Sequence, residues 1–172
     1  QYTIEDFIRN GTLTAEMAEY VKNAVLEGKS IIISGSTSSG KTTFLNMLAG
    51  FIPIGMRIIT IEDSAELSIR HNNTVRLETR NANTEGTGEI KMRALIKTAL
   101  RMRPDRLLIG EVRDESSLEL LTAMCTGHRG SMSTIHANSA KDTLVRLETM
   151  ALWEGHVHSE AIRRMIISGV DI

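Results

Sequence analysis

The chain has 172 residues, 41% of them hydrophobic, so it is long enough for one domain with a buried core. Its 20 basic residues nearly balance its 21 acidic residues, which argues against a bulk electrostatic grip on nucleic acid. The single cysteine, Cys125, excludes a disulfide framework and a zinc cluster of cysteines, and it fits a reducing, cytosolic setting. No apolar run approaches the roughly 20 residues that span a bilayer.

Helices and strands are expected to alternate along the chain. In chain order, the apolar patterns, caps and breakers predict a helix between Thr12 or Thr14 and Gly28, a strand at 31–33, a helix at 41–49, strands at 57–61 and 74–78, a polar loop at 81–88, a helix at 90–101, a strand at 106–109, a helix at 116–125, a strand at 131–135, and helices at 140–152 and 159–167. Strands that alternate with helices of this length form one sheet covered by helices on both faces. The predicted fold class is therefore α/β, with a mostly parallel sheet.

A phosphate-binding motif follows the first predicted strand. The residues from Gly35 to Thr42 match G-x-x-x-x-G-K-[ST] at every fixed position, with an apolar strand before them and a helix after them. In such a P-loop Lys41 would bridge the β- and γ-phosphate oxygens of ATP, and the Thr42 hydroxyl would bind Mg²⁺. A Gly/Ser-rich turn that matches by chance is the alternative, and the strand–loop–helix order disfavours it. The residues expected to bind nucleotide are Gly35, Ser38, Ser39, Gly40, Lys41, Thr42 and Thr43.

An acid lies where the strand predicted at 106–109 ends. This strand runs into Gly110 and Glu111, at the sheet edge where ligands of open α/β sheets bind. Gly110 occupies the position where many P-loop enzymes have an aspartate, and Asp105 lies at the wrong end of the strand. Glu111 is therefore the natural candidate to contact Mg²⁺ through a water molecule.

The acids after the strand predicted at 57–61 are candidates for activating water. Hydrolysis needs a second acid to orient the attacking water, and this strand ends in Glu62 and Asp63. By elimination Glu62 is expected to be the base, with Asp63 and Glu66 in support. The roles of Glu62 and Glu111 could be exchanged. The alternative use of these acids is to cap the backbone of the following helices.

Histidines flank the strand predicted at 131–135. His136 follows this strand, where an imidazole can donate to a γ-phosphate oxygen, and His128 precedes it. A lone histidine is more often a structural or solvated residue. That interpretation is kept for His71, His156 and His158. For His136 and His128, a role in the site is expected only because of the resemblance described below.

Several arginines could reach the triphosphate of a neighbouring subunit, as arginine fingers do. Arg76 and Arg80 flank an extended segment, and Arg113 is one of several arginines around the Glu111 strand. The default interpretation of each is a solvated charge or a surface ion pair. No single arginine finger can be named from the sequence.

The motifs occur in a specific order along the chain. They are the P-loop, residues 61–67 (IEDSAEL), residues 103–113 (RPDRLLIGEVR), and the segments 126–128 (TGH) and 134–138 (TIHAN). Together they resemble the Walker A, Asp box, Walker B and His box motifs of the type II/type IV secretion ATPases. Residues 75–80 and 100–104 most resemble the branch that serves Tad-type pili, and the conjugation and type IV secretion branch is close behind.

This resemblance implies a RecA-like P-loop core that hydrolyses Mg-ATP within a hexameric ring. It also implies a cytoplasmic location at the inner face of the cytoplasmic membrane, where the ring would dock on a platform protein and power pilus assembly or protein secretion. Residues 1–172 would be the C-terminal motor domain. Because the chain starts at Gln1, just upstream of the P-loop, the family's N-terminal domain, which closes over the nucleotide, is expected to be missing.

Two other functions remain open. A RecA-like DNA-translocating motor has a similar core, but the near-neutral charge and the three Phe, two Tyr and one Trp available for base stacking argue against binding to nucleic acid. A nucleotide-gated assembly module with little turnover is the other possibility. The missing N-terminal domain favours that module for an isolated fragment.

Overall fold

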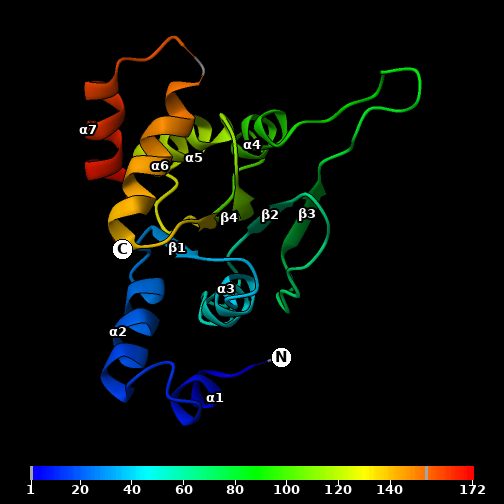
Figure 1. Cartoon of the computed structure of the whole chain (residues 1–172). Coiled ribbons are helices and arrows are strands. Elements are labelled where there is room, and N and C mark those ends of the chain that lie inside the picture. The colour runs from blue at the N-terminus through cyan, green and yellow to red at the C-terminus, as the bar shows by residue number, and fades with distance from the viewer. Residues whose placement is uncertain (1, 154) are drawn as a thin grey trace.

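A parallel sheet of five strands forms the centre of the computed structural model, which describes residues 2–153 and 155–172 (Figure 1). The strands are β1 (Ile31–Gly35), β2 (Ile58–Glu62), β3 (Thr74–Glu78), β4 (Arg106–Val112) and β5 (Met132–His136). Their order in the sheet is β1-β5-β4-β2-β3, and every neighbouring pair is parallel. The predicted α/β class with a parallel sheet is therefore confirmed.

The helices expected from the sequence are all present. The described part of the chain contains α1 (Ile4–Arg9), α2 (Ala15–Leu26), α3 (Lys41–Ala49), α4 (Met92–Leu100), α5 (Ser116–Cys125), α6 (Ala140–Leu152) and α7 (Ser159–Gly169). Helix α1 was not predicted, because six residues are too few to show a helical period. A capping box between Thr3 and Asp6 begins this helix. No helix within residues 2–153 and 155–172 combines the length and apolar composition needed to cross a bilayer.

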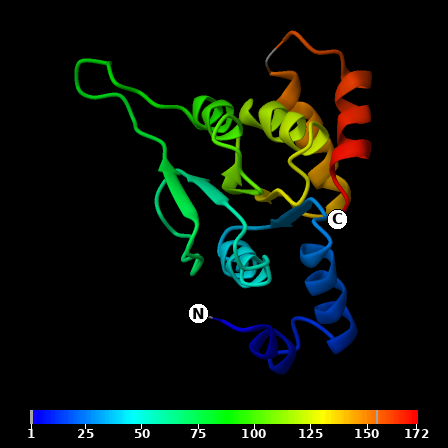
Figure 2. The ribbon, with the colours of Figure 1, turned by 180° about the vertical axis from the view of Figure 1, so that it is seen from behind.

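Helices cover both faces of the sheet (Figures 1 and 2). Helices α4 to α7 pack on one face, and α2 and α3 pack on the other. Successive residues of a central strand point into opposite cores: Leu107 and Ile109 belong to the first core and Leu108 to the second. This explains why the strand sequences are continuously apolar rather than alternating.

The carboxyl ends of the parallel strands meet at one edge of the sheet. Gly35, where β1 enters the P-loop, is the register partner of His136 at the end of β5. Strand β4 is longer than predicted and continues past Ile109 to Val112. Its pairing with β5 shifts between these two residues, which is a bulge that alters the backbone at Gly110 and redirects the Glu111 side chain. This edge is therefore built to present side chains from several strands to one place.

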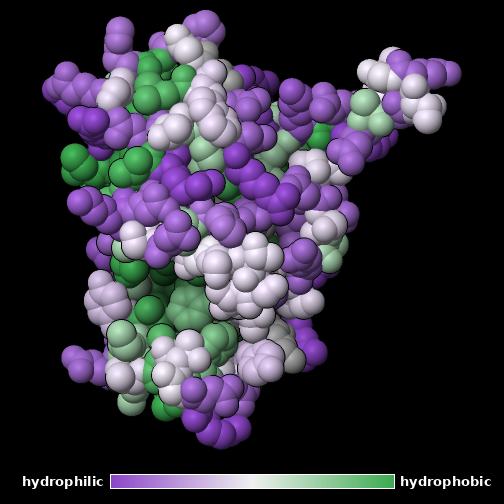
Figure 3. Space-filling view, in the orientation of Figure 1, coloured by the Kyte–Doolittle hydropathy of each residue, from purple (hydrophilic) through white to green (hydrophobic). Residues whose placement is uncertain are grey.

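The segment between β3 and α4 projects away from the body of the molecule (Figures 1 and 3). Its base is closed by an antiparallel bridge between Arg80 and Ile90. At its tip the Asn83 side chain accepts hydrogen bonds from the backbone N–H groups of Glu85 and Thr87. The polar loop predicted at 81–88 is therefore an ordered hairpin-like arm.

Candidate nucleotide-binding and hydrolysis site

The P-loop joins the end of β1 to the start of α3. Gly40 is the N-cap of α3 and has a φ of 88°, a left-handed conformation that favours glycine. Ser38 also has a positive φ, of 60°, which is uncommon for a residue with a side chain and frequent at ligand-binding loops. The loop thus turns sharply and leaves the free N–H groups of the first turn of α3 at its mouth, where an anion is stabilised.

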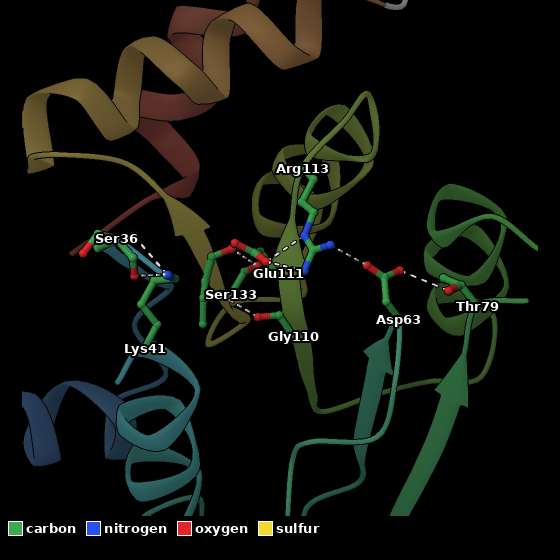
Figure 4. A network of polar contacts seen from close by, with 10 residues as sticks. Ser36, Lys41, Asp63, Thr79, Gly110, Glu111, Arg113 and Ser133 are labelled. Carbon is green, nitrogen blue, oxygen red and sulfur yellow. Dashed lines mark hydrogen bonds and ion pairs between the residues drawn. The ribbon is translucent and has the colours of Figure 1, made fainter. Parts of the chain in front are cut away.

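Lys41 folds back over this loop. Its Nζ donates to the carbonyl oxygens of Gly35, at 3.0 Å, and Ser36, at 2.8 Å (Figure 4). These bonds hold the ammonium group beside the backbone that would surround a phosphate chain. Among residues 2–153 and 155–172, backbone oxygens position the lysine and no carboxylate pairs with it.

A cavity of about 780 Å³ opens over the P-loop. It is lined by P-loop residues 37–43, by Glu62 at the end of β2 with Asp63 and Glu66 after it, by Glu111 on β4 with Arg113 after it, by Thr134 and His136 on β5, and by Arg146 on α6. Side chains from four strand ends therefore surround one cavity that is large enough for a nucleotide. Of the residues expected to bind nucleotide, Gly35 is not part of the lining; it contributes the carbonyl that holds Lys41.

Glu62 is almost fully buried, with 3% of its surface exposed. Its Oε1 accepts hydrogen bonds from the backbone N–H groups of Glu66, at 3.0 Å, and Leu67, at 2.8 Å. One carboxylate oxygen thus caps the backbone of the following loop, whereas the alternative considered from the sequence was a helix cap. The side chain also lines the cavity, so the same bonds fix the direction in which its second oxygen is presented.

Glu111 is paired with an arginine just after the end of its own strand. Arg113 donates from Nε to Glu111 Oε2 at 2.7 Å, and its Nη2 lies 2.6 Å from the same oxygen (Figure 4). The Arg113 guanidinium also lies 3.6 Å from Asp63, which in turn accepts a hydrogen bond from the Thr79 hydroxyl. The hydrogen bond to Glu111 raises the pKa of Arg113 above its ordinary value. Two ion pairs and one hydrogen bond therefore connect the end of β4 with the ends of β2 and β3.

The two histidines lie at opposite ends of β5. His136 is exposed at the carboxyl end of the strand and lines the cavity. His128 precedes the strand, donates its backbone N–H to the Ala123 carbonyl, and is not part of the cavity lining. The expectation that His128 supports the site is therefore corrected, because the whole of β5 separates it from the P-loop edge.

Two of the three candidate interface arginines bind backbone in their own chain. Arg76 donates to the carbonyl of Ile69 at 3.0 Å, and Arg80 donates to the carbonyl of Gly88 at 2.7 Å. Neither lines the cavity, whereas Arg113 does. Arg113 therefore lines the cavity of its own chain. Arg76 and Arg80 instead form hydrogen bonds with the backbone before β3 and in the arm.

Sequence reasoning did not single out Arg146. This side chain reaches the cavity from α6, about two turns after the helix begins at the Ser139 cap. The position of Arg146 on the helix that follows His136 could have suggested a place in the site. A helix that starts just after a strand end directs a side chain toward that sheet edge every three or four residues. Arg146 adds a positive charge opposite the P-loop.

The donor groups in the cavity suit Mg²⁺ bound together with phosphate. Within residues 2–153 and 155–172, no group of three or more His, Cys, Asp or Glu side chains could hold a metal ion by itself. Mg²⁺ in nucleotide sites takes one or two protein oxygens and completes its shell with phosphate and water oxygens. Thr42 and Glu111, which line the same cavity, fit that requirement.

The chain is similar to proteins of bacterial secretion and conjugation systems. The family model described as type II/IV secretion system protein matches residues 1–168. The probable conjugal transfer protein TrbB of Sinorhizobium fredii is 39% identical over 150 residues, which cover 86% of this chain and 44% of the relative. The type IV secretion system protein PtlH of Bordetella pertussis is 38% identical over 159 residues, which cover 90% and 47%. The chain thus spans about half the length of these relatives.

Solved structures agree with this similarity. The VirB11 ATPase of the Brucella suis type IV secretion system superposes with a TM-score of 0.80 at 29% identity, over 99% of this chain and 56% of that one. The pilus retraction motor PilT, solved with bound ADP, superposes with a TM-score of 0.69 at 27% identity, over 88% of this chain and 43% of that one. The chain belongs to the type II/IV secretion system protein family.

Proposed function

We propose that the chain is the nucleotide-binding domain of an ATPase that hydrolyses Mg-ATP to drive protein secretion or pilus assembly. The observation that supports this most directly is the single cavity lined by Lys41, Thr42, Glu62, Glu111 and His136. A nucleotide cradle alone would need only the first two of these. The VirB11 relative is described as an ATPase and PilT as a motor with bound ADP, which favours the same chemistry here.

The phosphates would lie along the P-loop, with Lys41 moving from the backbone carbonyls onto the β- and γ-phosphate oxygens. Thr42 and, through water, Glu111 would hold Mg²⁺, which would neutralise the charge that develops on the leaving phosphate. Glu62 would orient the attacking water and accept its proton. Its two backbone hydrogen bonds favour this role, because they fix the carboxylate without adding a counter-charge. Glu111 is instead held in an ion pair with Arg113.

His136 would donate to the γ-phosphate and so distinguish ATP from ADP. It lies at the end of β5, the strand that separates β1 from β4 in the sheet. Asp63 and Glu66 would support Glu62 and the charge network rather than touch the phosphates. Arg146 would add positive charge on the α6 side of the cavity.

The assembly would be a hexameric ring on the cytoplasmic side of the membrane, docked on a membrane platform protein. The relatives described as conjugal transfer and type IV secretion proteins favour that branch for this chain. The Tad-type pilus branch stays a prediction from the sequence. Arg76 and Arg80 lie outside the cavity of their own chain, so they remain candidates to act at a neighbouring subunit.

The decisive test is phosphate release by Glu62→Gln and Glu111→Gln, each compared with the unmodified protein. Each substitution is expected to lower turnover by at least about a hundredfold, the lower range for a positioned acid–base group. Glu160→Gln is a matched control on the surface of α7, where Glu160 pairs with Arg164, and it should keep full activity. Undiminished turnover in both site variants would contradict the proposal. Polynucleotide that accelerates turnover severalfold would favour a DNA motor instead.

A further inference from the structure

A second cavity lies at the opposite edge of the sheet from the P-loop. It has a volume of about 490 Å³, and its lining includes Lys29, Met56, Arg106 and Arg129. These residues precede β1, β2 and β5 or begin β4, so the cavity is formed at the amino ends of the parallel strands. It shares no lining residue with the nucleotide cavity.

Arg106 is the buried charge of this cavity. Only 9% of its surface is exposed. Its Nη1 donates to the carbonyl oxygens of Asp105, at 3.0 Å, and Arg129, at 3.4 Å. Its Nε is buried without a partner, and its Nη2 makes no hydrogen bond to any described residue. Since a guanidinium has five N–H donors, most of its hydrogen-bonding capacity is unused.

The surrounding backbone is shaped to leave room for this guanidinium. A Cβ on Gly130, whose φ is +79°, would lie 2.7 Å from Arg106 Nε, and a Cβ on Gly28 would lie 3.1 Å from its Nη2. Any side chain at Gly130 would therefore collide with the arginine. The two glycine loops enclose the guanidinium, and Arg106 lines the cavity between them.

Nearby charges do not neutralise Arg106. Lys29 and Arg129 share Asp171, at 3.9 and 3.3 Å. The Asp105 carboxylate accepts the backbone N–H of Arg57 at 2.6 Å, and no described acid forms an ion pair with Arg106. Burial accordingly lowers the pKa of Arg106, and Asp105 only partly opposes this effect. A buried cation without a partner is unfavourable unless something else supplies the negative charge.

We infer that this cavity binds a carboxylate, presented by an acidic side chain of a partner protein. The planar fork of a guanidinium matches the two oxygens of a carboxylate. Glu27 and Asp105 also line the cavity and offset the charges of Lys29 and Arg129, so a carboxylate with one negative charge is enough to balance Arg106. The cavity volume of about 490 Å³ exceeds that of a glutamate side chain. The site provides a docking point on the face away from the nucleotide.

The test follows the Arg106 Nε–H signal by NMR in the ¹⁵N-labelled chain. The probes are the blocked peptide acetyl-Gly-Glu-Gly-amide, its glutamine counterpart, sodium glutarate and inorganic phosphate, all at constant ionic strength. Arg106→Lys identifies the signal, and backbone-linked assignment replaces it if that variant does not fold. The glutamate peptide is expected to shift the signal saturably, and the glutamine peptide is not.

A rim variant tests the charge argument with Arg106 left intact. Glu27→Gln removes one negative charge from the lining and should tighten binding of the glutamate peptide about two- to fivefold at low salt. Glu19→Gln, on the same helix but outside the lining, should leave binding unchanged. Three outcomes would each overturn the proposal. The two peptides could shift the signal equally, or the glutamate peptide could cause no saturable shift. In the third outcome, phosphate or glutarate saturates the shift and the glutamate peptide does not.

Discussion

The side chain of Glu62 lies directly over the backbone of Gly110. A Cβ placed on Gly110 would come within 3.1 Å of Glu62 Cγ. The glycine that replaces the usual aspartate at this strand end therefore makes room for the acid of the neighbouring strand. Gly110 on β4 and the buried Glu62 on β2 are therefore one structural feature.

Gly110→Ala should consequently act as a catalytic variant. The added methyl group displaces Glu62 from its bonds with the loop, so turnover should fall by about a hundredfold while the affinity for ADP changes little. Phosphate release and ADP titration measure the two quantities. Because Gly110 acts through Glu62, adding Glu62→Gln to Gly110→Ala should cause little further loss. Fully additive losses, or normal turnover in Gly110→Ala, would contradict this explanation.

Lys41→Met should weaken ATP binding without weakening the fold. Within the described part of the chain, the lysine side chain donates to two P-loop carbonyls, so few native contacts are lost. Charge-assisted hydrogen bonds to phosphate contribute about 1.5–3 kcal/mol each, so affinity should fall at least tenfold. Binding of ATP and the midpoint of thermal unfolding are the measurements. Lys91→Met, at the N-cap of α4 where the side chain makes no cap bond, is the control and should change neither.

The strand ends could be predicted from the sequence because each follows an apolar run and carries an unusual polar residue. Lys41, Glu62, Glu111 and His136 all satisfy this description, and parallel topology then forces them to one edge. His128 was placed at the wrong edge of the sheet because it precedes its strand instead of following it. It is close to His136 in sequence, but β5 lies between the two residues.

Side-chain pairing was beyond the reach of sequence patterns. The bulge between Ile109 and Val112 and the direction of the Arg113 guanidinium depend on the packing of neighbouring strands. Arg113 was expected by default to be a solvated charge or a surface ion pair, with an arginine finger as the other possibility, and it forms an ion pair with Glu111 in its own chain. Arg146 was missed because helical periodicity gives the phase of a helix but not which cavity it faces.

Arg113 is therefore expected to act within its own subunit. Its guanidinium already contacts Glu111 and Asp63, so Arg113→Gln should disable the site in the same chain. In the assembled protein, mixing Arg113→Gln subunits with Lys41→Met subunits should not restore phosphate release. A finger that acts on the neighbouring subunit would restore activity in such mixtures, because each subunit would supply what the other lacks. Restored turnover would thus identify Arg113 as a residue of the neighbouring site. The same mixing with Arg76→Gln or Arg80→Gln provides the comparison.

The contact between α6 and α7 should make stability depend on pH in the acid range. Glu148 accepts two hydrogen bonds from Arg163, at 2.9 and 3.0 Å, and one from the Ser159 hydroxyl. The bonds from Arg163, and next that from Ser159, lower the pKa of Glu148 below its ordinary value of 4.5. A lowered folded-state pKa means that the stabilisation is complete above the unfolded-state pKa and is lost as the pH falls through the folded-state value.

Glu148→Gln should therefore be less stable than the unmodified chain at neutral pH, and the difference should shrink below about pH 4.5. Arg163 stays charged throughout this window because Glu148 raises its pKa. Urea unfolding at about pH 7 and about pH 3 measures the effect. Glu160→Gln removes an exposed pair on α7 and should change stability little at either pH. If Glu148→Gln lowers stability equally at both pH values, the carboxylate contributes through packing rather than through its charge.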